Sequence, residues 1–225
     1  SSSSAASDVY KRQLYSSTAT ISVLARKSRK ASEQEATDYV AAMLLAVSMM
    51  FLRFMILILI FSREIFLSIY PYLLTMAVVA AIVAWFIHSR QKRPEDQPAE
   101  TEEDDSSNPL EFKVALIFAV LFVIFTFLTH YTLVYAGTGG LNLLSFVSGF
   151  SDITPFILNL LQNTGSVAAL IITACSMQAI ISNIMVNMFY ALFFAGKGSK
   201  LRPWILGGFG VVIACNLVLL LFFYI

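Results

Sequence analysis

Charged residues and the side chains that usually build metal or catalytic centres are scarce in this sequence. Only 13% of its 225 residues are charged, and it holds two cysteines and two histidines. Cys175 and Cys215 lie inside apolar runs, at a spacing that fits neither a metal site nor a redox motif, so we expect both to be small buried hydrophobic residues. No cluster of histidine, cysteine and carboxylate side chains stands at ligand spacing. Enzymatic activity and a bound cofactor are therefore not expected.

An excess of charge of one sign is also absent. The formal net charge is +1, which points to no nucleic-acid partner. Residues 1–15 contain no apolar core region, so no signal peptide is predicted there. Residues 1–13 instead resemble a non-native, adapter-like leader, and we expect the chain to be a fragment whose true start is missing.

Long apolar runs dominate the rest of the chain. Hydrophobic residues make up 58% of it, and several runs reach the ~20 residues that a helix needs to cross a bilayer. The sequence therefore predicts an all-α, polytopic transmembrane helical bundle. The predicted spans are residues 39–61, 71–87, 114–135, 167–194 and 203–225, with a turn at residues 137–140.

Three basic clusters indicate how the chain is oriented. They lie at residues 26–30, 90–93 and 197–202, and the positive-inside rule places all three on the cytoplasmic side. Residues 94–108 are acidic, contain proline and have no apolar residue larger than alanine, which predicts a disordered cytoplasmic linker. This linker divides the chain into residues 14–93 and 109–225.

The two halves align with each other as a repeat. Residues 14–18 align with 150–154, Ser48 and Arg53 align with Ser182 and Asn187, and residues 71–74 align with 203–206. If residues 141–161 dip into the membrane and return, every basic cluster stays inside and the repeats are inverted. The alternative is a kinked segment that spans fully, with parallel repeats and one exception to the charge rule.

A polar break interrupts the apolar run 141–161. Residues 149–155 read GFSDITP, and they place a carboxylate and two hydroxyls where a membrane segment normally has aliphatic side chains. Such a break is tolerated only inside protein or beside water, and an ionisable residue there indicates a functional site. Asp152 with Ser151 and Thr154 is thus predicted to bind a cation or a proton. The alternative is that Asp152 only caps a half-helix that begins near Pro155.

Other polar residues at membrane depth are candidates for the same site. Ser16, Ser17 and Thr18 can line it, or they can hydrogen-bond to their own helix and allow close packing. Asn183 and Asn187 share a helix face and serve either as ligands or as links between helices. Arg53 either pairs with Asp152, contacts an anion, or extends to the membrane interface.

Several of these motifs resemble one bacterial family. The run SSTAT at residues 16–20, Asn108-Pro109, SGFSD at residues 148–152 and Ser182-Asn183 are similar to the membrane domain found C-terminal to the MgtC/SapB-type domain of inner-membrane proteins. The resemblance covers residues 14–225 and implies a multi-pass protein of the bacterial inner membrane. It also implies an MgtC/SapB-type domain as a partner absent from this chain. Asn187 departs from the family, which usually has lysine there, and the helix expected before residue 16 is absent.

These observations predict a membrane transporter or channel-like domain for a small ion, and they favour a cation over an anion. Its site is predicted at the paired polar helix breaks. The alternative is a membrane module that transports nothing and binds or regulates partner proteins. The predicted surroundings are the lipid bilayer and, in either case, a homo-oligomer.

Overall fold

A computed structural model describes residues 17–28, 33–89, 109–163, 167–196 and 199–224. Within these ranges the structure is entirely helical and has seven helices. They are α2 (Ser17–Ser28), α3 (Glu33–Phe61), α4 (Arg63–Ser89), α5 (Pro109–Ser148), α6 (Ile153–Gln162), α7 (Ala169–Ala195) and α8 (Arg202–Tyr224). The predicted leader 1–13, Ser16 and the predicted linker 94–108 lie outside the described residues.

Five of the helices are long and apolar enough to cross a membrane, which makes the chain a multi-pass membrane protein. The candidate spans are Thr37–Phe61, Arg63–Ser89, Ala119–Ser148, Ala169–Ala195 and Arg202–Phe222. They correspond to the five predicted spans, and the all-helical class is confirmed. α6, with 10 residues, is apolar but too short to span.

The predicted start of the second span at Pro71 is wrong. α4 begins at Arg63, and Pro71 lies inside it. The connection from α3 is only one residue long, because Ser62 donates its N–H to Ile58 O at 2.8 Å and accepts from Phe66 N at 3.0 Å. Proline removes one hydrogen bond of the helix ladder, a loss that transmembrane helices tolerate when nearby hydroxyls compensate. Thr75 Oγ1 donates to Pro71 O at 2.6 Å, a bond to the proline's own carbonyl and not to Leu67 O, the acceptor that the missing N–H would have served.

The predicted turn at residues 137–140 is a single-residue kink. Only Gly137 leaves the helical region, with φ 58° and ψ −148°, a conformation that glycine adopts without strain. α5 therefore consists of two helices, residues 109–136 and residues 138–148. The second helix, residues 138–148, contacts α7 through Asn142 and Phe146. We refer to residues 138–148 and α6 together as the hairpin.

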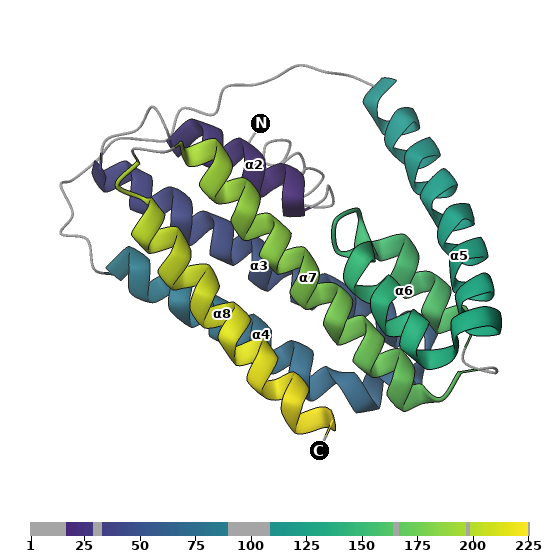
Figure 1. Ribbon diagram of the computed structural model, residues 1–225. Coiled ribbons are helices and arrows are strands. Elements are labelled where there is room, and N and C mark those ends of the chain that lie inside the picture. The colour runs from purple at the N-terminus through teal and green to yellow at the C-terminus, as the bar shows by residue number, and fades with distance from the viewer. Residues whose placement is uncertain (1–16, 29–32, 90–108, 164–166, 197–198, 225) are drawn as a thin grey trace.

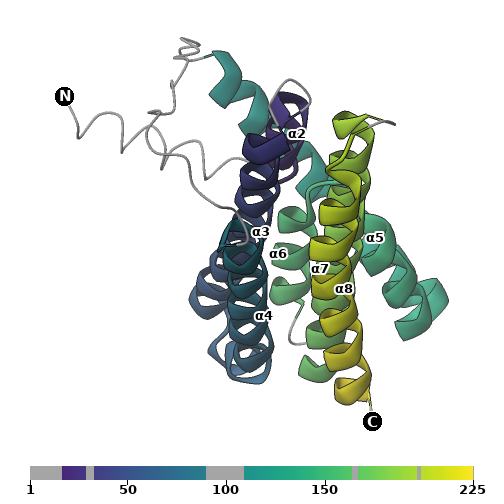
Figure 2. The same ribbon diagram turned by 90° about the vertical axis from the view of Figure 1, so that its left-hand side faces the viewer.

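α7 is the central helix of the molecule. In its apolar window 72% of the residues are buried, against 11% for α5. α3 packs on α4, and α8 packs on both α7 and α4, so the long helices form two adjoining pairs. Figures 1 and 2 show these pairs crossing the molecule side by side, with α5 standing at its edge.

The hydrogen bonds between α5, α6 and α7 give the direction of the hairpin. Cys175 contacts Asn142 and Ser182 contacts Phe146, so residues 138–148 run parallel to α7. The chain then reverses at residues 149–152, and α6 returns toward the start of α7. Figure 1 shows this reversal near the middle of the molecule.

Candidate functional site: the hairpin tip

The tip of the hairpin, residues 149–152, is a tight turn stabilised by its own backbone. Gly149 N donates to Phe146 O, Phe150 N to Val147 O, and Ser151 N to Ser148 O at 3.0 Å. These bonds satisfy the last carbonyls of residues 138–148, which have no partner within their own helix. The next helix begins at once, so two helix ends meet within four residues.

Asp152 caps α6. Its backbone is extended, with φ −74° and ψ 115°, and its Oδ1 accepts from Thr154 N at 3.0 Å. This geometry matches the capping interpretation of the sequence, with the helix starting at Ile153, two residues earlier than expected. The bond engages one carboxylate oxygen, and within the described part of the chain Oδ2 has no hydrogen-bond partner.

α7 holds the tip in place through two side chains. Ser182 Oγ donates to Phe146 O at 2.6 Å, and Asn183 Nδ2 donates to Gly149 O at 3.1 Å and to Ser151 O at 3.5 Å. A Cβ at Gly149 would lie 2.4 Å from Ser182 Cβ and 2.7 Å from Asn183 N. Glycine is thus required for the backbone to approach α7 this closely.

A pocket of about 160 Å³ lies against the tip. It is lined by Thr18, Gly149, Phe150, Ser151, Asp152, Asn183, Val186 and Tyr190. Asp152 is the only charged residue among them. The volume holds several waters, since one water needs ~10–15 Å³ on this measure, and a small ion with part of its hydration shell therefore fits.

Two helices begin at this pocket and leave it in opposite directions. α2 begins beside Thr18 and runs along α7 until Arg26, whose guanidinium carbon lies 4.3 Å from the ring centroid of Phe194. α6 begins directly after Asp152 in the chain and runs in the direction opposite to α2, as Figure 1 shows. Each helix start carries a positive partial charge of roughly half an elementary charge. The Asp152 carboxylate lies between them and offsets part of it.

Arg53 reaches the tip from α3. Its Nη2 donates to Thr154 Oγ1 at 2.8 Å, and its guanidinium carbon lies 5.2 Å from the ring centroid of Phe54. The side chain is half-buried, and its Nε is buried with no hydrogen-bond partner among the described residues. The guanidinium therefore points into the protein at α6. Within the described residues the salt bridge present joins His88 to Asp38, so Arg53 and Asp152 are near without being in direct contact.

The structure brings most of the predicted site residues to this junction. Thr18, Ser151, Asp152 and Asn183 line the pocket, and Thr154 lies beside it in α6. Asn187 is fully buried one turn along α7, where its Nδ2 donates to Asn183 Oδ1 at 3.2 Å and its Oδ1 has no partner among the described residues. Ser16 is outside the described residues, and of Ser17 only the backbone is described.

Two roles are clearer than the sequence allowed. Both polar atoms of the Asn183 side-chain amide are engaged, since Nδ2 donates to the tip and Oδ1 accepts from Asn187, so Asn183 positions the tip. The Ser151 hydroxyl donates to Ser148 O at 3.1 Å, which leaves its lone pairs as acceptors beside the pocket.

Sequence reasoning missed Tyr190, Val186 and Phe150 as lining residues. Tyr190 stands seven positions after Asn183, a spacing that puts it on the same face of α7, but an aromatic residue in an apolar helix gives no distinct signal. Among the described residues no group of three or more histidine, cysteine and acidic side chains could hold a metal ion. A cation at the tip would instead be bound by one carboxylate and neutral oxygens.

Comparisons with known proteins name a family for the chain but no activity. The family model described as Domain of unknown function (DUF4010) matches residues 13–195. An "Uncharacterized protein" of Aquifex aeolicus (strain VF5) is 26% identical over 115 residues, which cover 50% of this chain and 50% of that protein. The match thus spans about half the length of that relative. No solved structure matches the chain.

Proposed function

This chain belongs to the family described as Domain of unknown function (DUF4010), and from the geometry of the hairpin tip we propose that it transports a small cation across a membrane. In this proposal Asp152 binds the cation. The observation that supports this proposal is that the Asp152 carboxylate uses one oxygen to cap α6, while Asp152 lines a pocket of about 160 Å³. A carboxylate at membrane depth costs a few kcal/mol unless it is paired or solvated. A water-filled pocket and an exchangeable cation both remove that cost.

Neutral oxygens complete the coordination in this proposal. The hydroxyls of Thr18, Ser151 and Tyr190 belong to pocket-lining residues, and hard cations prefer such oxygen ligands. The helix starts oppose a cation, but a full carboxylate charge in direct contact outweighs partial charges at the ends of backbone dipoles. The chemistry is binding and passage, with no bond made or broken in the ion, so no enzymatic activity is proposed.

The hairpin would enter the bilayer and return on the same side. α6 has 10 residues and is thus ~15 Å long, about half of the ~30 Å hydrocarbon core. α2 and α6, starting from one pocket in opposite directions, are then corresponding elements of inverted repeats. Paired broken helices of this kind mark the binding site in many transporters.

We further propose that the end of the molecule near Arg26 and Lys200 is cytoplasmic. Arg26 lies in the last turn of α2 beside α7, Lys200 lies between α7 and α8, and Arg202 begins α8, so positive charge gathers at this end. At the opposite end, the α3–α4 junction carries Arg63 and Glu64, one charge of each sign. The positive-inside rule then orients the protein in a bacterial inner membrane.

A flux assay on Asp152→Asn tests the proposal. Asparagine caps a helix about as well as aspartate, so the variant should fold and insert normally while cation flux into reconstituted vesicles falls to background. Asp38→Asn is the matched control, because Asp38 is exposed, lies near the start of α3 and pairs with His88 of α4. The cation flux of this variant should equal that of the wild type. Unchanged flux in Asp152→Asn would retire Asp152 as the ligand.

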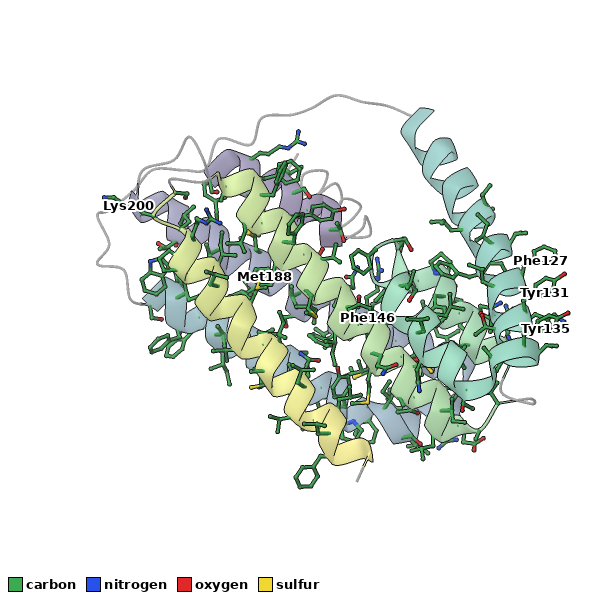
Figure 3. The ribbon with its side chains drawn as sticks, in the orientation of Figure 1. Phe127, Tyr131, Tyr135, Phe146, Met188 and Lys200 are labelled. Carbon is green, nitrogen blue, oxygen red and sulfur yellow. The ribbon has the colours of Figure 1, made fainter. Side chains whose placement is uncertain are left out.

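The alternative, a membrane module that binds partner proteins, has one observation in its favour. Phe127, Tyr131 and Tyr135 form a row that points away from the bundle (Figure 3), with 61%, 56% and 80% of their surfaces exposed. Lipid covers such a row equally well. Vesicles that show no flux for any cation, together with pull-down of a partner membrane protein that is lost when this row is changed to alanine, would favour this second function.

A further inference from the structure

Arg53 is a half-buried cation with an incomplete set of partners. It projects from α3 onto the start of α6, where Nη2 donates to Thr154 Oγ1 at 2.8 Å. Its Nε is buried and makes no hydrogen bond to any described residue. Burying an arginine in a membrane helix is costly, and such residues normally pair with an acid or with carbonyl groups. A neutral hydroxyl compensates this charge only weakly.

Thr154 connects Arg53 to Asp152. Its hydroxyl accepts from the guanidinium, while its backbone N–H donates to Asp152 Oδ1 at 3.0 Å. The cation and the carboxylate thus contact two groups of the same residue. An arginine side chain has several rotatable bonds and five N–H donors, so a change of rotamers can move the guanidinium from the threonine hydroxyl to the carboxylate without a movement of either helix.

We infer that Arg53 is the tethered counter-ion of the pocket: with no ion bound its guanidinium pairs with Asp152, and a monovalent cation binds by displacing it onto Thr154. This inference rests on the proposed function and deepens it. The present contact with Thr154 corresponds to the displaced position, since Asp152 lines the pocket and only its Oδ1 is engaged, by Thr154 N. The resident guanidinium already balances the single carboxylate, so a divalent ion would add two uncompensated charges where a monovalent ion adds one.

Two substitutions with opposite expected effects test the inference. Arg53→Gln removes the competitor, so Na⁺ or K⁺ should bind at least about tenfold more tightly, the effect of one opposite charge at this range. Thr154→Val removes the hydroxyl that holds the displaced guanidinium but keeps the backbone N–H, so the same ions should bind more weakly. The measurement is the ion-dependent rise in melting temperature of the purified full chain, with choline as the inert cation.

Arg63→Gln is the matched control, because Arg63 is exposed at the start of α4, and its ion affinity should equal that of the wild type. A purely structural Arg53 would lower the melting temperature of Arg53→Gln without tightening ion binding. If the Arg53→Gln protein does not fold, weaker binding in Thr154→Val still supports the inference, and unchanged binding overturns it.

The outcomes separate this inference from the proposed function. Ion binding that is lost in Asp152→Asn but unchanged or weaker in Arg53→Gln overturns the counter-ion and leaves the cation site. A wild type that binds no cation while Arg53→Gln does would support the counter-ion, since Arg53 then blocks the site. If neither protein binds Na⁺, K⁺ or a divalent cation, the proposed function and the inference both fail.

Discussion

At the residue scale, the decisive contact is between the backbone of Gly149 and α7. The chain comes so close that Ser182 Oγ and Asn183 Nδ2 can both bond to carbonyls of the hairpin. A methyl group would occupy the space that this approach requires. Side-chain hydrogen bonds between membrane helices contribute about 0.6 kcal/mol each on average, so close packing has to supply much of the stability here.

Gly149→Ala should therefore destabilise the protein by about 1–3 kcal/mol, the usual effect of overpacking, and should weaken ion binding with it. Its Cβ would meet Ser182 Cβ at 2.4 Å and the backbone nitrogen of Asn183 at 2.7 Å, and the latter cannot rotate away. Thermal unfolding in detergent measures the change. Gly207→Ala in α8 is the control, because a Cβ there has no neighbour within 4 Å; an equal loss in both variants would show that the contact with α7 is unimportant.

Sequence reasoning at this scale found the chemistry of the tip but not its geometry. Asp152, Ser151 and Thr154 stand out because polar groups at membrane depth are costly, and Thr18 followed from its alignment with Thr154. Whether Arg53 turns inward or toward the interface depends on which helix faces it, which no spacing along one chain reveals. Tyr190 was invisible for a similar reason, since its role depends on a hairpin that packs on α7.

At the element scale, α4 and α8 are joined by a buried polar pair. The Tyr72 hydroxyl donates to Asn216 Oδ1, and Asn216 Nδ2 donates to Val212 O at 2.7 Å within α8. Tyr72 is 4% exposed and Asn216 is fully buried. Every polar atom of the asparagine side chain is thus satisfied only while the two helices stay in register.

Tyr72→Phe should destabilise the protein by about 1 kcal/mol, because it leaves Asn216 Oδ1 buried without a donor. Adding Asn216→Leu removes the stranded acceptor and should restore part of the loss. Tyr70→Phe, two residues away on the exposed side of α4, should be neutral. Chemical denaturation in mixed micelles compares the four proteins, and an identical effect of the two tyrosine changes would contradict the proposed role of the pair.

The elements themselves were largely predictable, and the errors share one cause. The apolar runs predicted all five long helices, because ~20 apolar residues are needed wherever a helix crosses. Pro71 and residues 137–140 were read as boundaries from rules for helices in water. In the membrane the helix continues through Pro71, and Gly137 alone provides the bend, because a broken backbone ladder is more costly without water.

At the scale of the whole molecule, the ends of the helices define two surfaces. One surface contains the end of α4 at Ser89 and the connection between α7 and α8 at Ser199. The junction of α3 and α4 at Ser62 lies at the other end of α4. The side of the membrane on which Gln162 lies depends on whether the hairpin crosses the bilayer. If residues 138–162 return to the side they left, Gln162 shares a side with Ser62.

Single cysteines in a Cys175→Ala, Cys215→Ala background test this arrangement. With a membrane-impermeant maleimide on inverted and right-side-out vesicles, Ser62→Cys and Gln162→Cys should react from one side, and Ser89→Cys and Ser199→Cys from the other. The positive-inside rule makes the second side cytoplasmic. Labelling of Gln162→Cys from the same side as Ser89→Cys would mean that residues 138–162 cross the bilayer fully, and the inverted arrangement of α2 and α6 would then have to be abandoned.

The hairpin's dependence on α7 has a consequence for how the protein is made. Residues 138–148 and α6 are each too short to partition into a bilayer as a span, and they carry Ser145, Ser148 and Asn159, all buried in the finished structure. Their packing surface, Cys175 to Asn183, belongs to a helix that the ribosome synthesises later. We therefore expect the hairpin to reach its final position, and the pocket to form, only after α7 has been synthesised.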